Sequence, residues 1–205
     1  MRQNLTSVCL LSEEMAIDRK EQIYSTARSM FGERGYHATT VRDIARELNM
    51  QGGSLYAHIG SKEEVLWELV SRAAEQFLGA VEPIVESNAA PAEKLRQMVR
   101  AHVQVVADNL ADATVFLHEW KFLGEDRRTA IAGYRDRYEG LYRQVVEDGV
   151  KSGDFGPTDP KMAAMLVLSA VNWIPQWYKP SGPLSPGEVA DSFSELVLSG
   201  LRPRE

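Results

Sequence analysis

The sequence predicts an all-α protein of about nine helices, with a small N-terminal domain followed by a larger helical bundle. Apolar residues recur at helical spacing along most of the chain, and no segment shows the strict alternation of a half-buried β-strand. Hydrophobic residues make up 44% of the composition, which is enough for a packed core. Gly, Pro and capping residues separate the periodic segments, so each segment is expected to be an individual helix.

The composition also excludes several classes of protein. The single cysteine, Cys9, rules out an internal disulfide framework and a multi-cysteine metal site. The apolar run at 8–11 is too short for a signal peptide, and no stretch reaches membrane-spanning length. We therefore expect a cytoplasmic protein that does not enter a membrane, with residues 1–17 as a flexible arm.

The first helix of the N-terminal domain is predicted over residues 18–34, and Gly35 is expected to end it with a positive φ. A second helix should follow Thr40, because Asp43 stands at the capping-box spacing from it. This helix carries an apolar stripe at positions 41, 44, 45 and 48. Asn49 then suits the left-handed conformation that ends many helices.

A third, shorter helix is predicted over residues 52–59. Leu55 and Ile59 are its only large apolar residues, so it can bury one narrow edge. The other positions are small or able to form hydrogen bonds, and they include Gln51, Gly52, Ser54, Tyr56 and His58. A short helix with a narrow apolar anchor and a polar outer face has the shape that enters a DNA major groove.

Residues 23–66 resemble the helix-turn-helix domain of the TetR family of bacterial transcription repressors. The positions that carry the resemblance are Ile23, Ala27, Phe31, Gly35, Tyr36, Thr39, Thr40, Val41, Ile44, Ala45, Gly53, Leu55, Tyr56, Ser61, Lys62, Glu63 and Leu66. Asn49, Gln51 and Ile59 depart from the residues usual in the family, so no operator sequence is implied. The resemblance implies a DNA-binding domain at 18–64 and a ligand-binding and dimerisation domain at 65–205.

The charge distribution favours the N-terminal domain as the part that meets DNA. The whole chain has a net charge of −6. Residues 18–62 contain seven Lys or Arg and five Asp or Glu, a net charge of +2, which leaves −8 for the rest. We expect contacts to double-stranded operator DNA from Thr39, Thr40, Arg42, Gln51, Gly52, Gly53, Ser54, Tyr56, His58 and Lys62.

These candidates would contact DNA in different ways. Gln51 and Ser54 can form hydrogen bonds with base edges, and Gln favours adenine. Tyr56 is expected at a phosphate, and the resemblance implies the same for Lys62 at the start of a helix. Three of the candidates also have a simpler explanation, as a helix cap or as solvated side chains: Thr40, Arg42 and His58.

Helical patterns in the C-terminal part cover residues 61–85, 91–110, 113–124, 127–151, 162–178 and 185–201. Capping boxes are predicted at the start of the first and the last of them, from Ser61 with Glu64 and from Ser185 with Glu188. Pro175 should kink or break the helix predicted at 162–178, because proline cannot donate the helical hydrogen bond.

The helix at 162–171 is apolar on every side, with Ser169 as the exception. Such a helix is buried all round, by its own domain together with a partner or a ligand. The resemblance implies that the last two helices of each subunit form a four-helix interface. We therefore expect a homodimer through the last two helices, which would also present two recognition helices to two half-sites.

Aromatic, apolar and polar residues of the C-terminal half are candidates for an effector site: Phe116, Trp120, Leu123, Tyr134, Met165, Ser169, Asn172, Trp173 and Trp177. Core packing is the usual alternative for such residues at helical spacing. Residues 153–201 resemble the branch of the family that senses fatty acyl-CoA, which implies an effector of that kind and no cofactor. The CoA phosphates would need cations, for which the candidates are Lys121, Arg127, Arg128, Arg135 and Lys179.

Two other functions remain open beside a ligand-responsive DNA-binding regulator, which the family majority makes a repressor. An enzyme or a metal-carrying bundle is disfavoured, because no Glu has a His three residues later. The four histidines also lack the spacing of a zinc site: His37, His58, His102 and His118. The second alternative is a small-molecule or lipid-binding helical protein that has lost operator binding.

Overall fold

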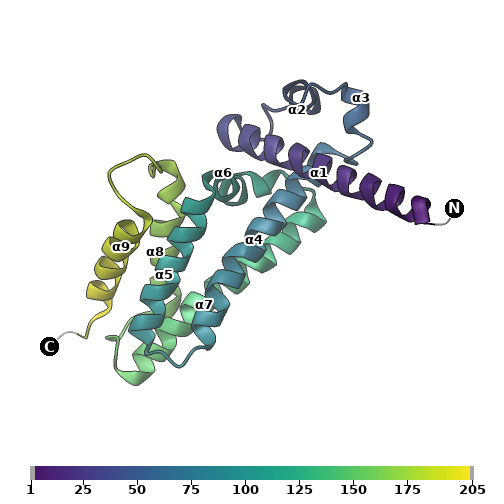
Figure 1. Cartoon of the computed structure of the whole chain (residues 1–205). Helices are drawn as coiled ribbons and strands as arrows, with labels where there is room; N and C mark the ends of the chain where they lie inside the picture. The colour runs from purple at the N-terminus through teal and green to yellow at the C-terminus, as the bar shows by residue number, and fades with distance from the viewer. Residues whose placement is uncertain (1–2, 204–205) are drawn as a thin grey trace.

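A computed structural model describes the backbone of residues 3–203 and the side chains of residues 19–203. Within that range every regular element is a helix, and nine of them are α-helices. The predicted all-α fold is therefore confirmed. Helices α1 to α3 form a small unit at one end, and the other helices extend away from it (Figure 1).

α1 (Gln3–Arg34) begins earlier than the sequence pattern indicated. The expected helix start near residue 18 is wrong, because the backbone is helical from Gln3 through most of the predicted arm at 1–17. This segment contains no Gly or Pro that would stop a helix. Its side chains lie outside the described residues. The other end of α1 agrees with the prediction, since Gly35 follows it with a φ of +85°.

α2 (Val41–Glu47) packs against α1, and α3 (Gly52–Leu55) packs against α2. The predicted capping box is confirmed: Thr40 Oγ1 accepts a hydrogen bond from Asp43 N at 3.1 Å, and Asp43 Oδ2 accepts one from Thr40 N at 3.0 Å. Asn49 follows α2 with a φ of +53°, as predicted. The short turn that results sets α3 beside α2.

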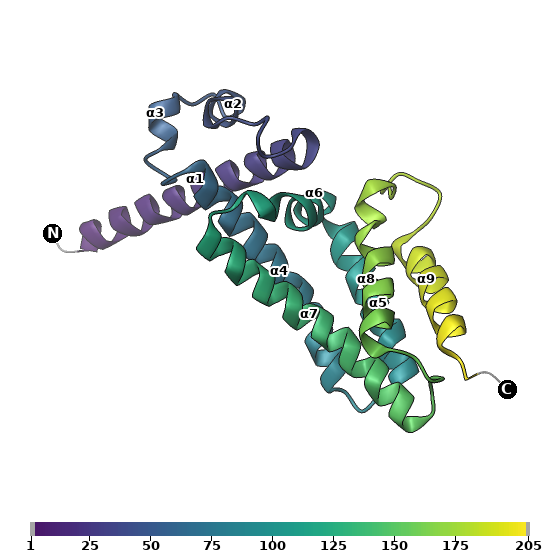
Figure 2. The ribbon, with the colours of Figure 1, turned by 180° about the vertical axis from the view of Figure 1, so that it is seen from behind.

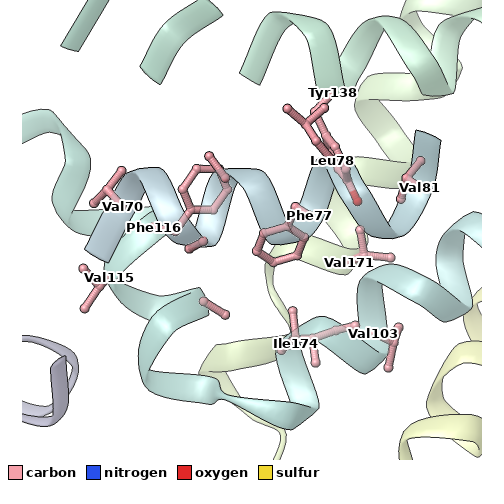
Figure 3. Close-up of a cluster of buried hydrophobic side chains, with 14 of the residues drawn as sticks. Val70, Phe77, Leu78, Val81, Val103, Val115, Phe116, Tyr138, Val171 and Ile174 are labelled. Carbon is pink, nitrogen blue, oxygen red and sulfur yellow. The ribbon is translucent and has the colours of Figure 1, made fainter. Parts of the chain in front are cut away.

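Three long helices lie side by side in the second unit (Figures 1 and 2): α4 (Lys62–Glu86), α5 (Pro91–Asp108) and α7 (Glu125–Ser152). Ser61 caps α4 by accepting a hydrogen bond from Glu64 N at 3.0 Å. The Glu64 carboxylate accepts one from Gly60 N instead of Ser61 N, so half of the predicted capping box forms. A cluster of buried apolar side chains, which includes Phe77 of α4, fills the space between these helices (Figure 3).

The segment predicted as one helix over 113–124 consists of three different elements. α6 (Leu110–Thr114) passes directly into a π-helix, η1 (Val115–Glu119), and then into a 3₁₀ helix, η2 (Trp120–Phe122). The apolar spacings of these helix types are too similar over so few residues for a sequence pattern to separate them.

α8 (Pro160–Asn172) and α9 (Pro186–Leu201) follow α7 at one side of the bundle (Figure 2). α8 stops at Asn172, and Pro175 lies in a separate 3₁₀ helix, η3 (Ile174–Gln176), so the predicted break is confirmed. The capping box of Ser185 and Glu188 also forms at the start of α9.

Within the chain, α8 buries only one of its faces. That face carries small or β-branched residues, namely Ala163, Ala164, Val167 and Val171. On the other side Met162 and Leu166 are 61% and 70% exposed, and Leu196 of α9 is 76% exposed. All three line a groove of about 350 Å³ between the two helices. The chain alone therefore leaves an apolar surface on α8 and α9 in contact with solvent.

Candidate nucleic-acid interface and effector site

Two buried side chains anchor residues 51–59, the recognition segment. Leu55 and Ile59 are 0% and 2% exposed, as their spacing predicted. α3 itself ends at Leu55, and a hydrogen-bonded turn continues to Ile59, whose N–H donates to Leu55 O at 3.2 Å. The helix begins at Gly52 as predicted and ends four residues before the predicted end at 59.

The outer face of this segment carries most of the predicted DNA-binding residues. Gln51, Gly53, Ser54 and Tyr56 are exposed. Gln51 is the N-cap residue of α3, but its side chain makes no capping hydrogen bond, so its amide is available to a ligand. The two remaining predicted residues of the segment, Gly52 and His58, are half-buried.

Two residues from the α2 region belong to the same domain surface. Arg42 is exposed, and a Cβ added to Gly52 would lie 3.9 Å from Arg42 Cγ, which places this side chain beside α3. Thr40 is exposed as well, and its hydroxyl donates to Asp43 Oδ2 at 2.6 Å. Hydrogen bonds from Thr40 lower the pKa of the Asp43 carboxyl. The role of Thr40 as a cap is confirmed, and its contact with DNA stays a prediction.

Thr39 does not lie on this surface. Its side chain is fully buried, and Oγ1 donates to Gly35 O at 3.0 Å, with Met30 O as a second acceptor at 3.3 Å. These hydrogen bonds tie the α1–α2 connection to the end of α1. Thr39 and Thr40 are neighbours in sequence, but only Thr40 faces solvent. The expected contact of Thr39 with DNA is corrected for this reason.

Lys62, the first residue of α4, lies at the junction between the two units. Its Nζ is 3.9 Å from the centroid of the Tyr36 ring, which is a cation–π distance. Burial lowers the pKa of the Lys62 ammonium, and the Glu119 carboxylate opposes this shift. The contact of Lys62 with a phosphate stays a prediction.

Tyr36 also connects the small unit to the segment that holds η1 and η2. Its backbone N–H donates to Glu119 Oε2 at 2.8 Å. Its ring stacks on Phe122, with 6.0 Å between the ring centroids and 13° between the ring planes. Tyr36 is therefore held by a carboxylate and by an aromatic ring, both of which belong to the second unit.

Two further polar contacts reinforce this junction. Arg28 Nε of α1 lies 2.6 Å from Asp112 Oδ1 of α6. Burial raises the pKa of the Asp112 carboxyl, and Arg28 opposes that shift. Glu63 Oε1 accepts a hydrogen bond from Gly124 N at 3.1 Å. The junction segment, residues 109–127, thus contacts α1, the α1–α2 connection and the start of α4.

The predicted effector residues fall into two groups, one in the bundle and one on or after α8. Phe116 and Leu123 are buried in the bundle, and Trp120 and Tyr134 are half-buried. The others lie on or after α8, where Asn172 is half-buried and four residues are exposed: Met165, Ser169, Trp173 and Trp177. α8 turns its alanines and valines inward, so Met165 and Ser169 of α8 face away from the interior of the bundle. A single effector site that includes both groups stays a prediction.

One of the predicted cations lies beside the inner group. The guanidinium carbon of Arg135 is 5.2 Å from the ring centroid of Trp120 and 5.9 Å from that of Phe116. Burial lowers the pKa of Arg135, and the charge of Asp136 opposes the shift. A half-buried guanidinium between aromatic rings is suited to bind an anionic group of a ligand.

The bundle also buries polar groups that the sequence did not single out. His102 of α5 is 1% exposed, and its Nδ1 lies 3.0 Å from the hydroxyl oxygen of Tyr138 of α7. Burial lowers the pKa of His102 to about 3, and the backbone of Val171 opposes this in part. Both residues stand in the apolar stripes of their helices. An apolar stripe does not reveal which other helix it packs against, so the sequence does not predict the pairing of His102 with Tyr138.

The described part of the chain also bears on two other classes of site. Its His, Cys, Asp and Glu side chains nowhere form a group of three or more that could hold a metal ion. Its helices include none that is long and apolar enough to span a membrane.

Comparison with known proteins relates both units to one family. Residues 23–69 match "Bacterial regulatory proteins, tetR family", and residues 88–201 match "Tetracyclin repressor-like, C-terminal domain". The chain belongs to the TetR family. Proteins of this family are DNA-binding transcription regulators and not enzymes. The resemblance inferred from residues 23–66 is therefore confirmed.

Individual TetR proteins match nearly the whole chain. The HTH-type transcriptional repressor KstR2 of Mycobacterium tuberculosis (strain ATCC 25618 / H37Rv) is 30% identical over 185 residues, which are 89% of this chain and 92% of the relative. The structure of the ketosteroid transcriptional regulator KstR2 of Mycobacterium tuberculosis matches with a TM-score of 0.86 and 29% identity, over 91% of this chain and 96% of that one.

Two further solved structures are similar. PfmR from Thermus thermophilus matches with a TM-score of 0.81 and 36% identity, over 88% of this chain and 98% of that one. AibR in complex with isovaleryl coenzyme A and operator DNA matches with a TM-score of 0.78 and 27% identity, over 91% of this chain and all of that one, 100%.

Proposed function

We propose that this TetR protein is a transcriptional repressor that binds operator DNA as a homodimer and leaves it on binding an effector of the acyl-CoA class. The observation that carries the proposal is the exposed polar face at 51–58, anchored by Leu55 and Ile59, in a chain whose two parts both match TetR regulators. The relatives support the response: KstR2 is named a repressor, and AibR binds isovaleryl coenzyme A and operator DNA. Such a function belongs in the cytoplasm.

The DNA contacts follow from exposure and chemistry. Gln51 and Ser54 would form hydrogen bonds with base edges, and Tyr56 and Arg42 would contact phosphates. Gly52 and Gly53 would let the backbone approach the groove closely. Because residues 18–62 carry a net charge of only +2, one copy should bind DNA weakly. Two copies at a set spacing would supply the affinity.

The outward faces of α8 and α9 are proposed as the dimer interface. Met162, Leu166 and Leu196 are large, apolar and mostly exposed, and they line one groove. In a two-fold dimer the same residues of the second copy would cover them. Met165 and Trp173, which the sequence suggested for the effector site, would then belong to this interface.

The inner group of predicted effector residues is proposed as part of the acyl-CoA site. Phe116 packs on Phe77 within the bundle, with 5.3 Å between the ring centroids, so this region suits an apolar chain. Arg135 next to Phe116 would attract an anionic part of the ligand.

The junction segment would transmit the response. Phe116 and Glu119 both belong to η1, and Phe116 contacts the bundle core whereas Glu119 binds Tyr36 N. A ligand that displaces Phe116 would shift the carboxylate that positions the DNA-binding domain. The ligand would thereby favour a dimer geometry that no longer matches the two half-sites. By linkage, operator DNA would weaken ligand binding by the same factor.

The test begins with selection of operator fragments from the source genome by the purified protein. Fluorescence polarisation then gives the operator Kd with and without dodecanoyl-CoA, and calorimetry gives the dodecanoyl-CoA Kd with and without operator. Both Kd values should rise by one common factor. Equal acyl-CoA affinity in both states would refute the allosteric part. If no fragment is selected although acyl-CoA binds, the protein is a ligand-binding protein that has lost operator binding.

A further inference from the structure

His102 lies in an aromatic layer at the centre of the bundle. Its ring centroid is 4.8 Å from that of Phe77 on α4 and 5.9 Å from that of Tyr138 on α7. Phe116 of η1 extends the layer by stacking on Phe77, with 5.3 Å between the ring centroids (Figure 3). Three α-helices and the π-helix thus meet around one imidazole ring.

The hydrogen bonds of this layer leave one atom unpaired. His102 Nδ1 is 3.0 Å from the Tyr138 hydroxyl, and the Tyr142 hydroxyl donates to Met98 O at 3.1 Å. His102 Nε2 is buried and makes no hydrogen bond of normal geometry in the described part of the chain, although the backbone of Val171 lies near enough to the ring to raise the pKa of His102. An unpaired buried polar atom opposes folding, and an apolar side chain would fill the same place without that cost. A ligand that supplies the missing hydrogen bond would account for the histidine.

The surroundings select an uncharged ligand group. Burial lowers the pKa of His102, so the ring is neutral near pH 7. The titratable groups that face it, Tyr138 and Tyr142, have their pKa values raised by burial and are neutral too. No charge here would compensate a buried carboxylate or phosphate, whereas a carbonyl or hydroxyl oxygen needs one hydrogen bond only.

We propose that His102 Nε2 binds a carbonyl or hydroxyl oxygen carried by the acyl part of the effector, while Tyr138 holds the ring through Nδ1. The inference rests on the proposed acyl-CoA response and narrows it to oxygenated acyl groups over plain saturated chains. If Tyr138 donates to Nδ1, Nε2 carries the proton and donates to either kind of oxygen. If Nδ1 donates to Tyr138, Nε2 accepts and selects a hydroxyl.

Calorimetry with the full-length protein and three ligands tests this: dodecanoyl-CoA, 3-oxododecanoyl-CoA and 12-hydroxydodecanoyl-CoA. The wild type should bind at least one oxygenated ligand about tenfold more tightly than the plain one, since one good hydrogen bond is gained. His102→Phe, which keeps a ring of similar size, should bring that ratio close to one. Tyr138→Phe should lower the ratio as well, and it replaces His102→Phe as the test if that variant does not fold.

Tyr178→Phe is the control, because it removes the hydroxyl of a buried tyrosine whose ring contacts Trp177 rather than this aromatic layer, and it should leave the ratio unchanged. Equal binding of all three ligands by the wild type would overturn the inference and leave the acyl-CoA response standing. The same holds if the preference survives in both His102→Phe and Tyr138→Phe. Binding of none of the three would refute the proposed acyl-CoA response itself, and the inference with it.

Discussion

Glu119→Ala should uncouple the effector from the operator. The substitution removes the carboxylate that accepts the Tyr36 N–H at 2.8 Å, and it removes the negative charge near Lys62. A hydrogen bond to a charged group contributes about 1.5–3 kcal/mol. Because Glu119 is half-buried, we take the lower end, about 1.5 kcal/mol. Roughly 1.4 kcal/mol is a factor of ten, so the coupling factor should fall about tenfold.

The assay is fluorescence polarisation of the selected operator, with and without saturating dodecanoyl-CoA, and the ratio of the two Kd values is the coupling factor. Glu119→Gln keeps an oxygen acceptor without the charge, so its coupling factor should lie between those of the wild type and Glu119→Ala. Asp126→Ala removes an exposed acid from the same segment and should leave the ratio unchanged. If Glu119→Ala retains the coupling factor of the wild type, the junction segment does not transmit the response.

Three further changes address the DNA surface, the core and the buried histidine. Tyr56→Phe should weaken binding equally for all operator variants, whereas Gln51→Ala should change the order of their affinities, and competition assays measure both effects. If Tyr56→Phe changed that order and Gln51→Ala did not, the assignment of Tyr56 to phosphate and of Gln51 to base edges would be wrong. Gly149→Ala should lower the urea midpoint by an amount equivalent to about 1–3 kcal/mol, because a Cβ there overlaps the Phe155 ring; an unchanged midpoint would contradict this. Below the ordinary histidine pKa of 6.5, unfolded His102 binds a proton that the folded protein, with its pKa of about 3, does not bind. Stability should therefore fall by up to about 1.4 kcal/mol per pH unit towards pH 3, and His102→Phe should reduce the slope measured by urea unfolding.

Local features of the fold were predictable because nearby residues determine them. The Thr40–Asp43 capping box, the positive φ values of Gly35 and Asn49, and the break before Pro175 all follow from interactions within a few positions. The anchoring of the recognition segment by two apolar residues also follows from spacing alone. The exposed polar residues of that segment were identified for the same reason.

Features that depend on which elements meet were not predictable. The burial of Thr39 requires the α1–α2 connection to fold back on the end of α1. The pairing of His102 with Tyr138 requires α5 and α7 to be neighbours in a particular register. The orientation of α8 was not predictable either, because a helix that is apolar all round gives no sign of the face that turns inward. The exposure of Trp173, which follows α8, could not be predicted for the same reason.

The π-helix η1 has a consequence for the register between the two halves of the protein. In an α-helix, residues three apart lie on the same face, which would turn Phe116 and Glu119 in one direction. The wider π turn separates their directions, so that one reaches Phe77 in the core and the other reaches Tyr36. Deletion of a single residue within 115–119 would convert this turn to an ordinary one. The DNA-binding domain would then lose its alignment with the bundle although every helix on either side remained intact.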